Sequence, residues 1–205
     1  MFTNPEENAK KQSSFAQSLD TGKTASDASH NLLGINSAEI FNEEQRKAIL
    51  DSCVEELWMP CKVVGDNDLH VGDRQKLKGE PTDFPFTDIR DITKQANDEV
   101  YDFKLLGIID QDYPQVFKYE EGGYYGYHID INPLAMTRKI SWMVILEDTD
   151  DNAKNIKFLN TDLDSDVMKV GNIVVWPSFL PWQIEKIEKG SLTVAVGHIH
   201  GAAFR

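Results

Sequence analysis

A histidine and an aspartate stand two positions apart in the segment Tyr119–Asn132, which reads YEEGGYYGYHIDIN. On a β-strand, side chains at positions i and i+2 point to the same face and lie about 7 Å apart. His128 and Asp130 could therefore approach one metal ion with a neutral imidazole and an anionic carboxylate. By itself a His-x-Asp pair is weak evidence, because a histidine at a strand end is usually a polar surface residue.

The residues that precede the pair strengthen the case for a metal site. Tyr119 and Gly122 give the segment the pattern Y-x-x-G-x5-H-x-D. Two histidines and one carboxylate form the facial triad that binds iron(II) in non-heme oxygenases. His128 and Asp130 would supply two of these three ligands, and the third has to come from another part of the chain.

Two amphipathic helices followed by eight short strands are predicted for residues 42–201. The first helix begins with a capping box at Asn42 and continues until Pro60, and the second covers residues 88–101. The strand segments are rich in β-branched and aromatic residues: FKLLGI, QVFKYE, YYGYHIDI, KISWMVILE, NIKFLN, NIVVWP, WQIEKIE and LTVAVGHIHG. This order favours an α+β fold, a double-stranded β-helix (jelly roll) supported by two or more N-terminal helices. It argues against a dinucleotide-binding fold, in which strands and helices alternate.

The chain divides into an arm and a domain. Residues 1–34 are rich in Asn, Ser, Thr, Lys and Gln and show little apolar periodicity, so we expect a polar N-terminal arm. Residues 35–205 are expected to form a single jelly-roll domain. Within it, residues 61–87 contain spaced glycines and prolines and are predicted to be loop.

Composition excludes several classes of partner. The formal net charge of -13 argues against nucleic acid, because a phosphate backbone would be repelled. No apolar run approaches the ~20 residues of a membrane span, and the polar N-terminus lacks the apolar stretch of a secretory signal. Cys53 and Cys61 give no disulfide framework, so we expect a cytoplasmic protein.

From Ala38 to Phe204 the chain resembles the iron(II)/2-oxoglutarate-dependent dioxygenases, in particular the prolyl-4-hydroxylase-like branch. The resemblance rests on the order of elements and on the segments FKYEEGGYYGYHIDI, RKISWMVILED and VGNIVVWPSFLPWQIEKIEKGSLTVAVGHIHG. It implies iron(II) bound by His128 and Asp130 as catalytic residues, and 2-oxoglutarate as co-substrate, which Tyr119 would help to hold. It also implies hydroxylation of an unactivated C–H bond in a peptide or small-molecule substrate.

The closing segment departs from the family at two functional positions. The family places its second ligand histidine a few residues after an aromatic-Pro-Ser sequence; here that position is Gln183, 53 residues after Asp130 (183 − 130). About nine residues further on, the family has a cation that pairs with 2-oxoglutarate, and here that position is Leu192. An amide oxygen is a weaker metal donor than an imidazole. Removing one partner of a buried ion pair typically costs ~2–5 kcal/mol.

Neither His198 nor His200 is expected to replace the missing ligand. On an extended strand His198 would lie about 20 Å beyond Leu192, too far for a site fixed by Gln183. The sequence HIH is instead typical of a strand end with partly exposed imidazoles. Two hypotheses stay open: an active oxygenase, and a jelly-roll binding protein that has kept the fold and lost turnover. The substrate and the oligomeric state stay open as well.

Overall fold

The computed structural model describes residues 35–61, 69–80, 82–132, 135–161, 163 and 166–203. The predicted arm at residues 1–34 lies outside this part of the chain. No helix within the described ranges is long and apolar enough to cross a membrane.

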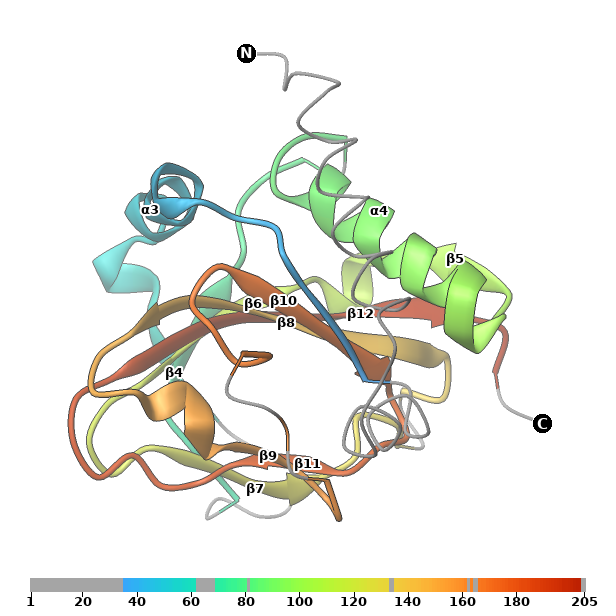
Figure 1. Ribbon diagram of the computed structural model, residues 1–205. Coiled ribbons are helices and arrows are strands. Elements are labelled where there is room, and N and C mark those ends of the chain that lie inside the picture. The colour runs from blue at the N-terminus through green and yellow to red at the C-terminus, as the bar shows by residue number, and fades with distance from the viewer. Residues whose placement is uncertain are drawn as a thin grey trace.

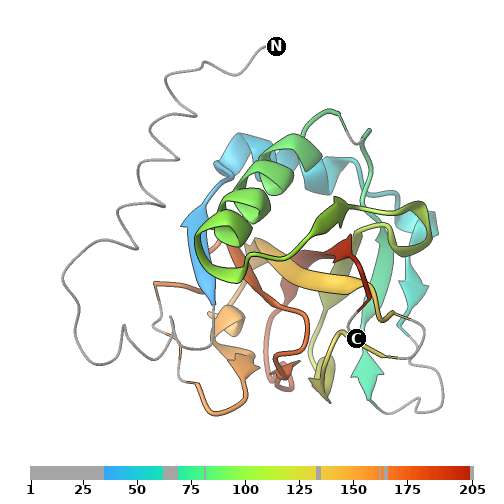
Figure 2. The ribbon, with the colours of Figure 1, turned by 90° about the vertical axis from the view of Figure 1, so that its right-hand side faces the viewer.

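Two antiparallel sheets face each other, and helices cover the outer side of the larger sheet (Figures 1 and 2). The larger sheet has the strand order β1-β10-β8-β12-β6-β4-β2, with β5 also paired to β12, and the smaller has the order β3-β7-β11-β9. The strand bounds are Asn36–Glu39 (β1), Met59–Pro60 (β2), His70–Val71 (β3), Asp73–Lys76 (β4), Leu105–Gly107 (β5), Gln115–Tyr119 (β6), Tyr124–His128 (β7), Arg138–Asp148 (β8), Ile156–Phe158 (β9), Asn172–Pro177 (β10), Trp182–Ile184 (β11) and Leu192–Gly201 (β12). This layered arrangement confirms the predicted α+β fold class.

The helices follow the predicted order but differ in their bounds. The helical elements are α3 (Glu43–Asp51), η1 (Glu55–Leu57), α4 (Phe86–Ala96), η2 (Asn97–Tyr101), η3 (Asp110–Asp112) and η4 (Asn152–Asn155). The predicted capping box is present, because the side chains of Asn42 and Gln45 each accept the other's backbone N–H. The first helix, predicted to continue until Pro60, ends at Asp51. Beyond it, the Val54 N–H donates to the Gln75 side chain instead of continuing the helix. The predicted loop at residues 61–87 contains β3 and β4.

Side-chain alternation along the central strands separates two apolar cores. One set of β8 residues lies in the core beneath the helices: Ile140, Trp142, Val144 and Leu146. The other face of β8 contributes Met143 and Ile145 to the core between the sheets. Because successive side chains on a strand alternate, Ser141 also faces the space between the sheets. On β12 the same rule places His198 on the side of Val194 and Val196.

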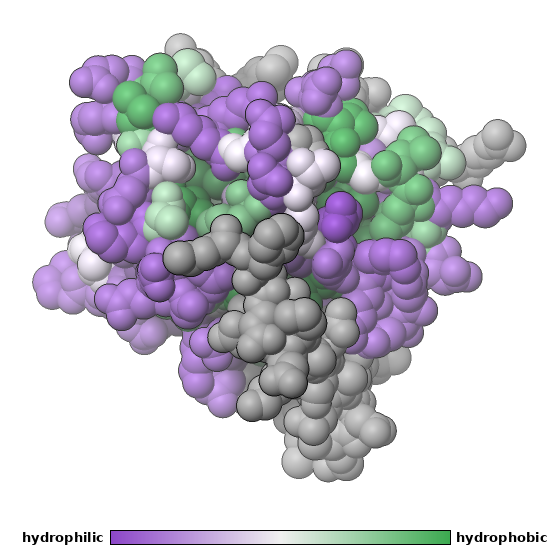
Figure 3. Space-filling view, turned by 90° about the horizontal axis from the view of Figure 1, so that it is seen from above, coloured by the Kyte–Doolittle hydropathy of each residue, from purple (hydrophilic) through white to green (hydrophobic). Residues whose placement is uncertain are grey.

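The helix-bearing face has a largely hydrophilic surface. Seen from above, hydrophobic side chains form small separate groups among polar ones (Figure 3). This pattern agrees with the formal net charge of -13. On this face the exposed apolar side chains are therefore scattered and do not form one large patch.

Gly197 occupies a position on β12 with no room for a side chain. A Cβ added there would lie 2.5 Å from Cζ2 of Trp142 and 2.8 Å from Cγ of Pro114. Real Cβ atoms do not approach so closely, so glycine lets β12 pack against both residues. This packing also fixes the strand segment that carries His198.

Gly197→Ala is expected to lower the free energy of unfolding by about 1–3 kcal/mol, because overpacking a dense core forces its neighbours to shift. Urea unfolding measures the loss. Trp142→Phe removes the ring atom that the new methyl group would meet, so the double variant should lose less than the sum of the two single losses. Strictly additive losses would contradict this explanation.

Candidate functional site

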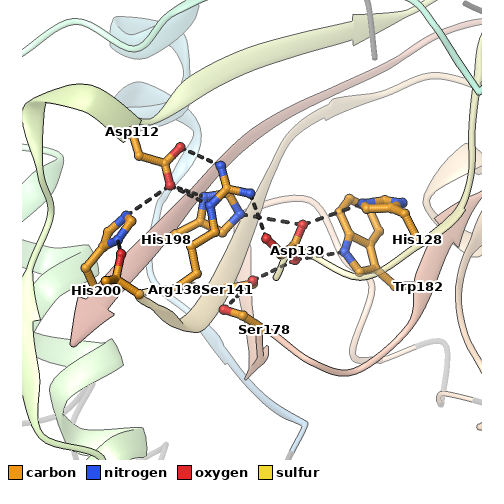
Figure 4. A network of polar contacts seen from close by, with 10 residues as sticks. Asp112, His128, Asp130, Arg138, Ser141, Ser178, Trp182, His198 and His200 are labelled. Carbon is orange, nitrogen blue, oxygen red and sulfur yellow. Dashed lines mark hydrogen bonds and ion pairs between the residues drawn. The ribbon is translucent and has the colours of Figure 1, made fainter. Parts of the chain in front are cut away.

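Asp130 lies at the centre of a buried polar network between the two sheets (Figure 4). Only 5% of this residue is exposed. Its backbone N–H donates to the carbonyl oxygen of Ser178 at 3.0 Å, and its own carbonyl accepts from Arg138 Nη1 at 2.9 Å. The backbone that carries the carboxylate is therefore held between the loop after β10 and strand β8.

One carboxylate oxygen of Asp130 accepts two hydrogen bonds from different sheets. Oδ2 lies 2.6 Å from Oγ of Ser141 on β8 and 3.0 Å from Nε1 of Trp182 on β11. Oγ of Ser178 lies a further 2.9 Å from that of Ser141. Oδ2 of Asp130 thus accepts hydrogen bonds from both the smaller and the larger sheet.

The other carboxylate oxygen, Oδ1, faces two imidazoles. Nε2 of His128 lies 3.5 Å from it and Nε2 of His198 lies 3.6 Å from it, and Figure 4 shows the carboxylate between the two rings. Neither Nε2 atom has a hydrogen-bond partner among the described residues. Nδ1 of His128 is 2.8 Å from the carbonyl oxygen of Gly126. A carbonyl only accepts, so Nδ1 carries a proton, and Nε2 is the ring nitrogen that faces Asp130.

A second carboxylate, Asp112, anchors the outer end of the network. Arg138 binds it with two parallel hydrogen bonds, from Nε and from Nη2, each 2.6 Å long. Its Oδ2 is also 3.2 Å from Nδ1 of His198 and 2.9 Å from Nε2 of His200. Thr137 Oγ1 fixes the His200 ring from the other side, 2.9 Å from Nδ1.

Opposite charges inside the network shift its pKa values. Burial alone would raise the pKa of Asp130, but the contacts with His128 and His198 lower it far below its usual range. For Asp112, too, hydrogen bonds from its imidazole and guanidinium partners outweigh burial and lower the pKa. Burial would lower the pKa of His198, but the two carboxylates beside it raise it. With His198 protonated, two carboxylates are balanced by this imidazolium and by Arg138.

A stack of rings fills the space beside His128. The ring centroids of His70 and Tyr125 are 3.8 Å apart, those of Tyr125 and His128 are 3.7 Å apart, and Trp182 lies 4.5 Å from His128. The hydroxyl of Tyr119 is 2.8 Å from Nε2 of His70. Burial, together with repulsion by His128, lowers the pKa of His70 to about 3, so its ring is neutral.

Solved structures of prolyl hydroxylases are similar to this arrangement of sheets and helices. A Pseudomonas putida prolyl-4-hydroxylase matches with a TM-score of 0.62 at 15% identity, over 84% of this chain and 96% of that chain. The viral collagen prolyl hydroxylase of Paramecium Bursaria Chlorella virus-1, as a 2-oxoglutarate complex, matches with a TM-score of 0.61 at 13% identity, over 82% and 96%. A Trichoplax adhaerens prolyl hydroxylase in complex with a hypoxia inducible factor oxygen degradation domain peptide fragment gives 0.64 at 11%, over 97% and 94%.

This chain has the fold of the prolyl-4-hydroxylase-like 2-oxoglutarate oxygenases. The predicted resemblance is confirmed at the level of the fold. No family model and no curated protein matches the sequence. At such low identities the similarity shows the fold alone, so the chemistry has to be argued from the site.

Tyr119 and Leu192 are buried neighbours in this oxygenase fold. They pair in register between β6 and β12, and they are 1% and 0% exposed. The Tyr119 hydroxyl is engaged with His70, and burial raises its pKa well above the ordinary value. Leu192 belongs to the apolar core between the sheets. The position predicted for a cation therefore carries an apolar side chain, and the role of Tyr119 towards 2-oxoglutarate stays a prediction.

Gln183 does not lie opposite the His128–Asp130 pair, and we correct the predicted third position to Trp182. Trp182 pairs in register with His128, and its side chain points inward to Asp130. Alternation then turns Gln183 to the outer face, where its amide lies 3.5 Å from Glu185 and lines an open hollow of about 640 Å³. A shift of one residue on a strand reverses the face, which explains the error.

The expectation that His198 and His200 are partly exposed is wrong. They are 8% and 2% exposed, respectively. The site is organised around Asp130, and β12 pairs with β8 so that His198 lies opposite Ser141. The sequence contains a signal for this: HIH has the same i, i+2 spacing as the His-x-Asp pair and therefore presents both imidazoles on one face.

The residues at this site do not fit the iron centre that the resemblance implies. The indole N–H of Trp182 only donates, so it offers no lone pair to a metal ion. Leu192 offers no charge to a bound 2-oxoglutarate. Across the described ranges, no three His, Cys, Asp or Glu side chains are grouped so that they could hold a metal ion. Of the predicted ligands, His128 and Asp130 do lie together, with His128 Nε2 facing Asp130 Oδ1 at 3.5 Å.

The neutral, buried His70 is expected to make stability depend on pH. Its pKa is about 3 in the folded chain against an ordinary value of 6.5, so between these values the unfolded chain binds more protons. The free energy of unfolding should fall as the pH drops from about 6.5 towards 3, by up to ~1.4 kcal/mol per pH unit from this residue. Above pH ~7 this contribution is fully present.

Urea unfolding of the wild type and His70→Gln over a range of pH isolates this effect. The stability advantage of the wild type should be constant near neutral pH and shrink in acid, because glutamine does not titrate. A stability difference that stays the same from neutral pH down to about 4 would show that His70 is not held neutral by burial.

Proposed function

We propose that this chain is a jelly-roll binding protein that retains the oxygenase fold without 2-oxoglutarate turnover. The observation that carries the proposal is the hydrogen bond from Trp182 Nε1 to Asp130 Oδ2, 3.0 Å long. The third metal ligand is predicted at Gln183, but the residue that lies opposite His128 is Trp182, whose indole is a donor. The fully buried Leu192 stands at the position predicted for the cation. Trp182 would weaken the binding of iron and Leu192 that of 2-oxoglutarate, so neither replacement compensates for the other.

One observation favours the alternative, an oxygenase that is still active. Nε2 of His128 is buried without a hydrogen-bond partner among the described residues and faces Asp130 Oδ1 at 3.5 Å. A metal ion could use these two donors. The metal ion would then need ligands other than His198, because the Asp130 carboxylate lies between His128 and His198 (Figure 4).

We assign the partner's binding surface to three exposed apolar side chains on loops that backbone hydrogen bonds connect, and we name these side chains the apolar rim. Ile129, Leu159 and Phe179 are 46%, 43% and 51% exposed. They lie on three neighbouring loops of the jelly roll. Backbone hydrogen bonds of 3.0 Å connect these loops: Asp130 N–H to Ser178 O and Leu159 N–H to Pro181 O. The rim therefore lies on loops that the network below it holds in place.

The proposed partner is an extended, proline-rich peptide that carries basic residues. A phenyl ring with two aliphatic side chains offers apolar surface against which proline rings pack, and a polyproline segment loses little conformational entropy on binding. The formal net charge of -13 favours a positively charged peptide. A similar structure, from Trichoplax adhaerens, is a prolyl hydroxylase in complex with a peptide fragment.

Turnover is tested by incubating the protein anaerobically with Fe(II) and 2-oxoglutarate and then admitting oxygen. The wild type is expected to give no metal-to-ligand charge-transfer band and no succinate, because it lacks the third ligand and the cation. The double variant Trp182→His/Leu192→Arg supplies both and should show the band, whereas Trp182→His alone should retain metal without 2-oxoglutarate. A band or succinate from the wild type would overturn the proposal.

Partner binding is tested by calorimetry with a synthetic (Pro-Pro-Gly)5 peptide that carries two N-terminal arginines. Phe179→Ser should weaken binding about tenfold or more, because a central aromatic contact is lost. The matched control is Leu57→Ser on η1, where the side chain is 53% exposed and η1 directly precedes β2, an edge strand of the larger sheet. Absence of binding, or the same loss in both variants, would exclude the apolar rim as the peptide site.

A further inference from the structure

We propose that Trp182, Asp130 and Ser141 form a structural clasp that joins the two sheets without a metal ion. This inference goes beyond the proposed function, because the clasp would hold the sheets together whatever the chain binds. The clasp consists of the two hydrogen bonds to Asp130 Oδ2, from Trp182 Nε1 at 3.0 Å and from Ser141 Oγ at 2.6 Å. Its members come from β11, from the loop after β7 and from β8.

The burial of Asp130 makes these donors necessary. A carboxylate that is 5% exposed has lost nearly all of its contact with water and is strongly destabilising unless donors or cations surround it. Trp182 and Ser141 satisfy Oδ2, and the imidazole of His198 faces Oδ1 at 3.6 Å. Hydrogen bonds to a charged acceptor are stronger than those between neutral groups. Groups of the chain itself therefore satisfy Oδ2 by hydrogen bonds, and imidazoles face Oδ1 at 3.5 and 3.6 Å.

The position of the clasp explains why it can connect the layers. Ser141 faces the space between the sheets from an interior strand of the larger sheet, because β8 pairs on both sides, with β10 and with β12. Trp182 reaches the same carboxylate from β11, which is flanked by β7 and β9 in the smaller sheet. Around this polar contact the interface between the sheets is apolar. The carboxylate is thus a directional link between the sheets in a mostly apolar core, in addition to the hydrogen bond between Tyr119 on β6 and His70 on β3.

Trp176 provides a matched comparison for Trp182. The two indoles pack against each other with ring centroids 5.3 Å apart, and both are essentially fully buried. Nε1 of Trp176 has no hydrogen-bond partner within the described part of the chain, whereas Nε1 of Trp182 donates to Asp130. Replacing either residue by phenylalanine removes the same atoms from the same core. Only Trp182→Phe also removes a hydrogen bond to a charge.

Thermal unfolding of the two variants in the presence of EDTA tests the clasp. Trp182→Phe should lower Tm by at least about 4 °C more than Trp176→Phe, because it leaves a buried carboxylate short of a donor. The Tm of the wild type should be unchanged by EDTA or by added Co(II). Equal losses in the two variants, or a wild type that Co(II) stabilises, would overturn the clasp.

A spectroscopic readout separates the hydrogen bond from simple packing and does not depend on whether Trp182→Phe folds. The indole N–H resonance of Trp182 in a proton–nitrogen correlation spectrum should move upfield in Asp130→Asn, while that of Trp176 stays in place. Ser141→Ala should move the Trp182 resonance as well, because both donors share one oxygen. If the chemical shift of the Trp182 indole N–H is the same in both variants as in the wild type, the proposed clasp is contradicted. Failure of the proposed function would appear separately, as succinate formation by the wild type.

Discussion

A negative charge buried between two sheets is the constraint on which the rest of this structure depends. Most of the interface between the sheets is apolar, and apolar contacts alone do not prescribe one relative position of two layers. The carboxylate of Asp130 does, because its oxygens require donors in defined directions. Ser141 and Trp182 meet this requirement from opposite sheets, and the backbone bond to Ser178 fixes the loop that carries the charge. Misplacing any of these groups would leave a charge uncompensated in the core.

The second carboxylate follows from the same constraint. A protonated His198 next to Asp130 would be a buried cation, and Asp112 stabilises it from the other ring nitrogen at 3.2 Å. Arg138 then compensates Asp112 through two hydrogen bonds and also reaches the Asp130 carbonyl. The raised pKa of His198 favours its protonated form, and in that form the imidazolium and Arg138 balance the two carboxylates. Balance of this kind is what makes a buried ionic network tolerable, since an unpaired member would be strongly destabilising.

The sequence pattern could predict the long strands because β8, β10 and β12 are buried on both faces, which requires continuous runs of mainly apolar residues. The predicted segments around β6, β8, β10 and β12 overlap the observed ones. What periodicity could not supply was which of two adjacent residues faces inward on the three-residue strand β11, where the choice between Trp182 and Gln183 depends on its pairing with His128. The approach of His198 to Asp130 was equally inaccessible, because it depends on the register of β12 against β8. The pairing of His70 with Tyr119 carries no signal in the sequence.

Retention of the His-x-Asp pair is compatible with loss of oxygenase chemistry, because each residue has structural partners of its own. His128 is stacked on Tyr125 and bonded to Gly126, and Asp130 carries the contacts between the sheets. What distinguishes a metal centre from the observed network is the chemical character of one ring at the position of Trp182. An imidazole there could present a lone pair to an ion shared with the carboxylate, whereas an indole presents a proton to the carboxylate directly. The His128–Asp130 pair in the sequence therefore predicts the fold but not a metal site. Whether the Asp130 carboxylate needs a metal ion depends on whether the residue at position 182 donates a hydrogen bond or offers a lone pair.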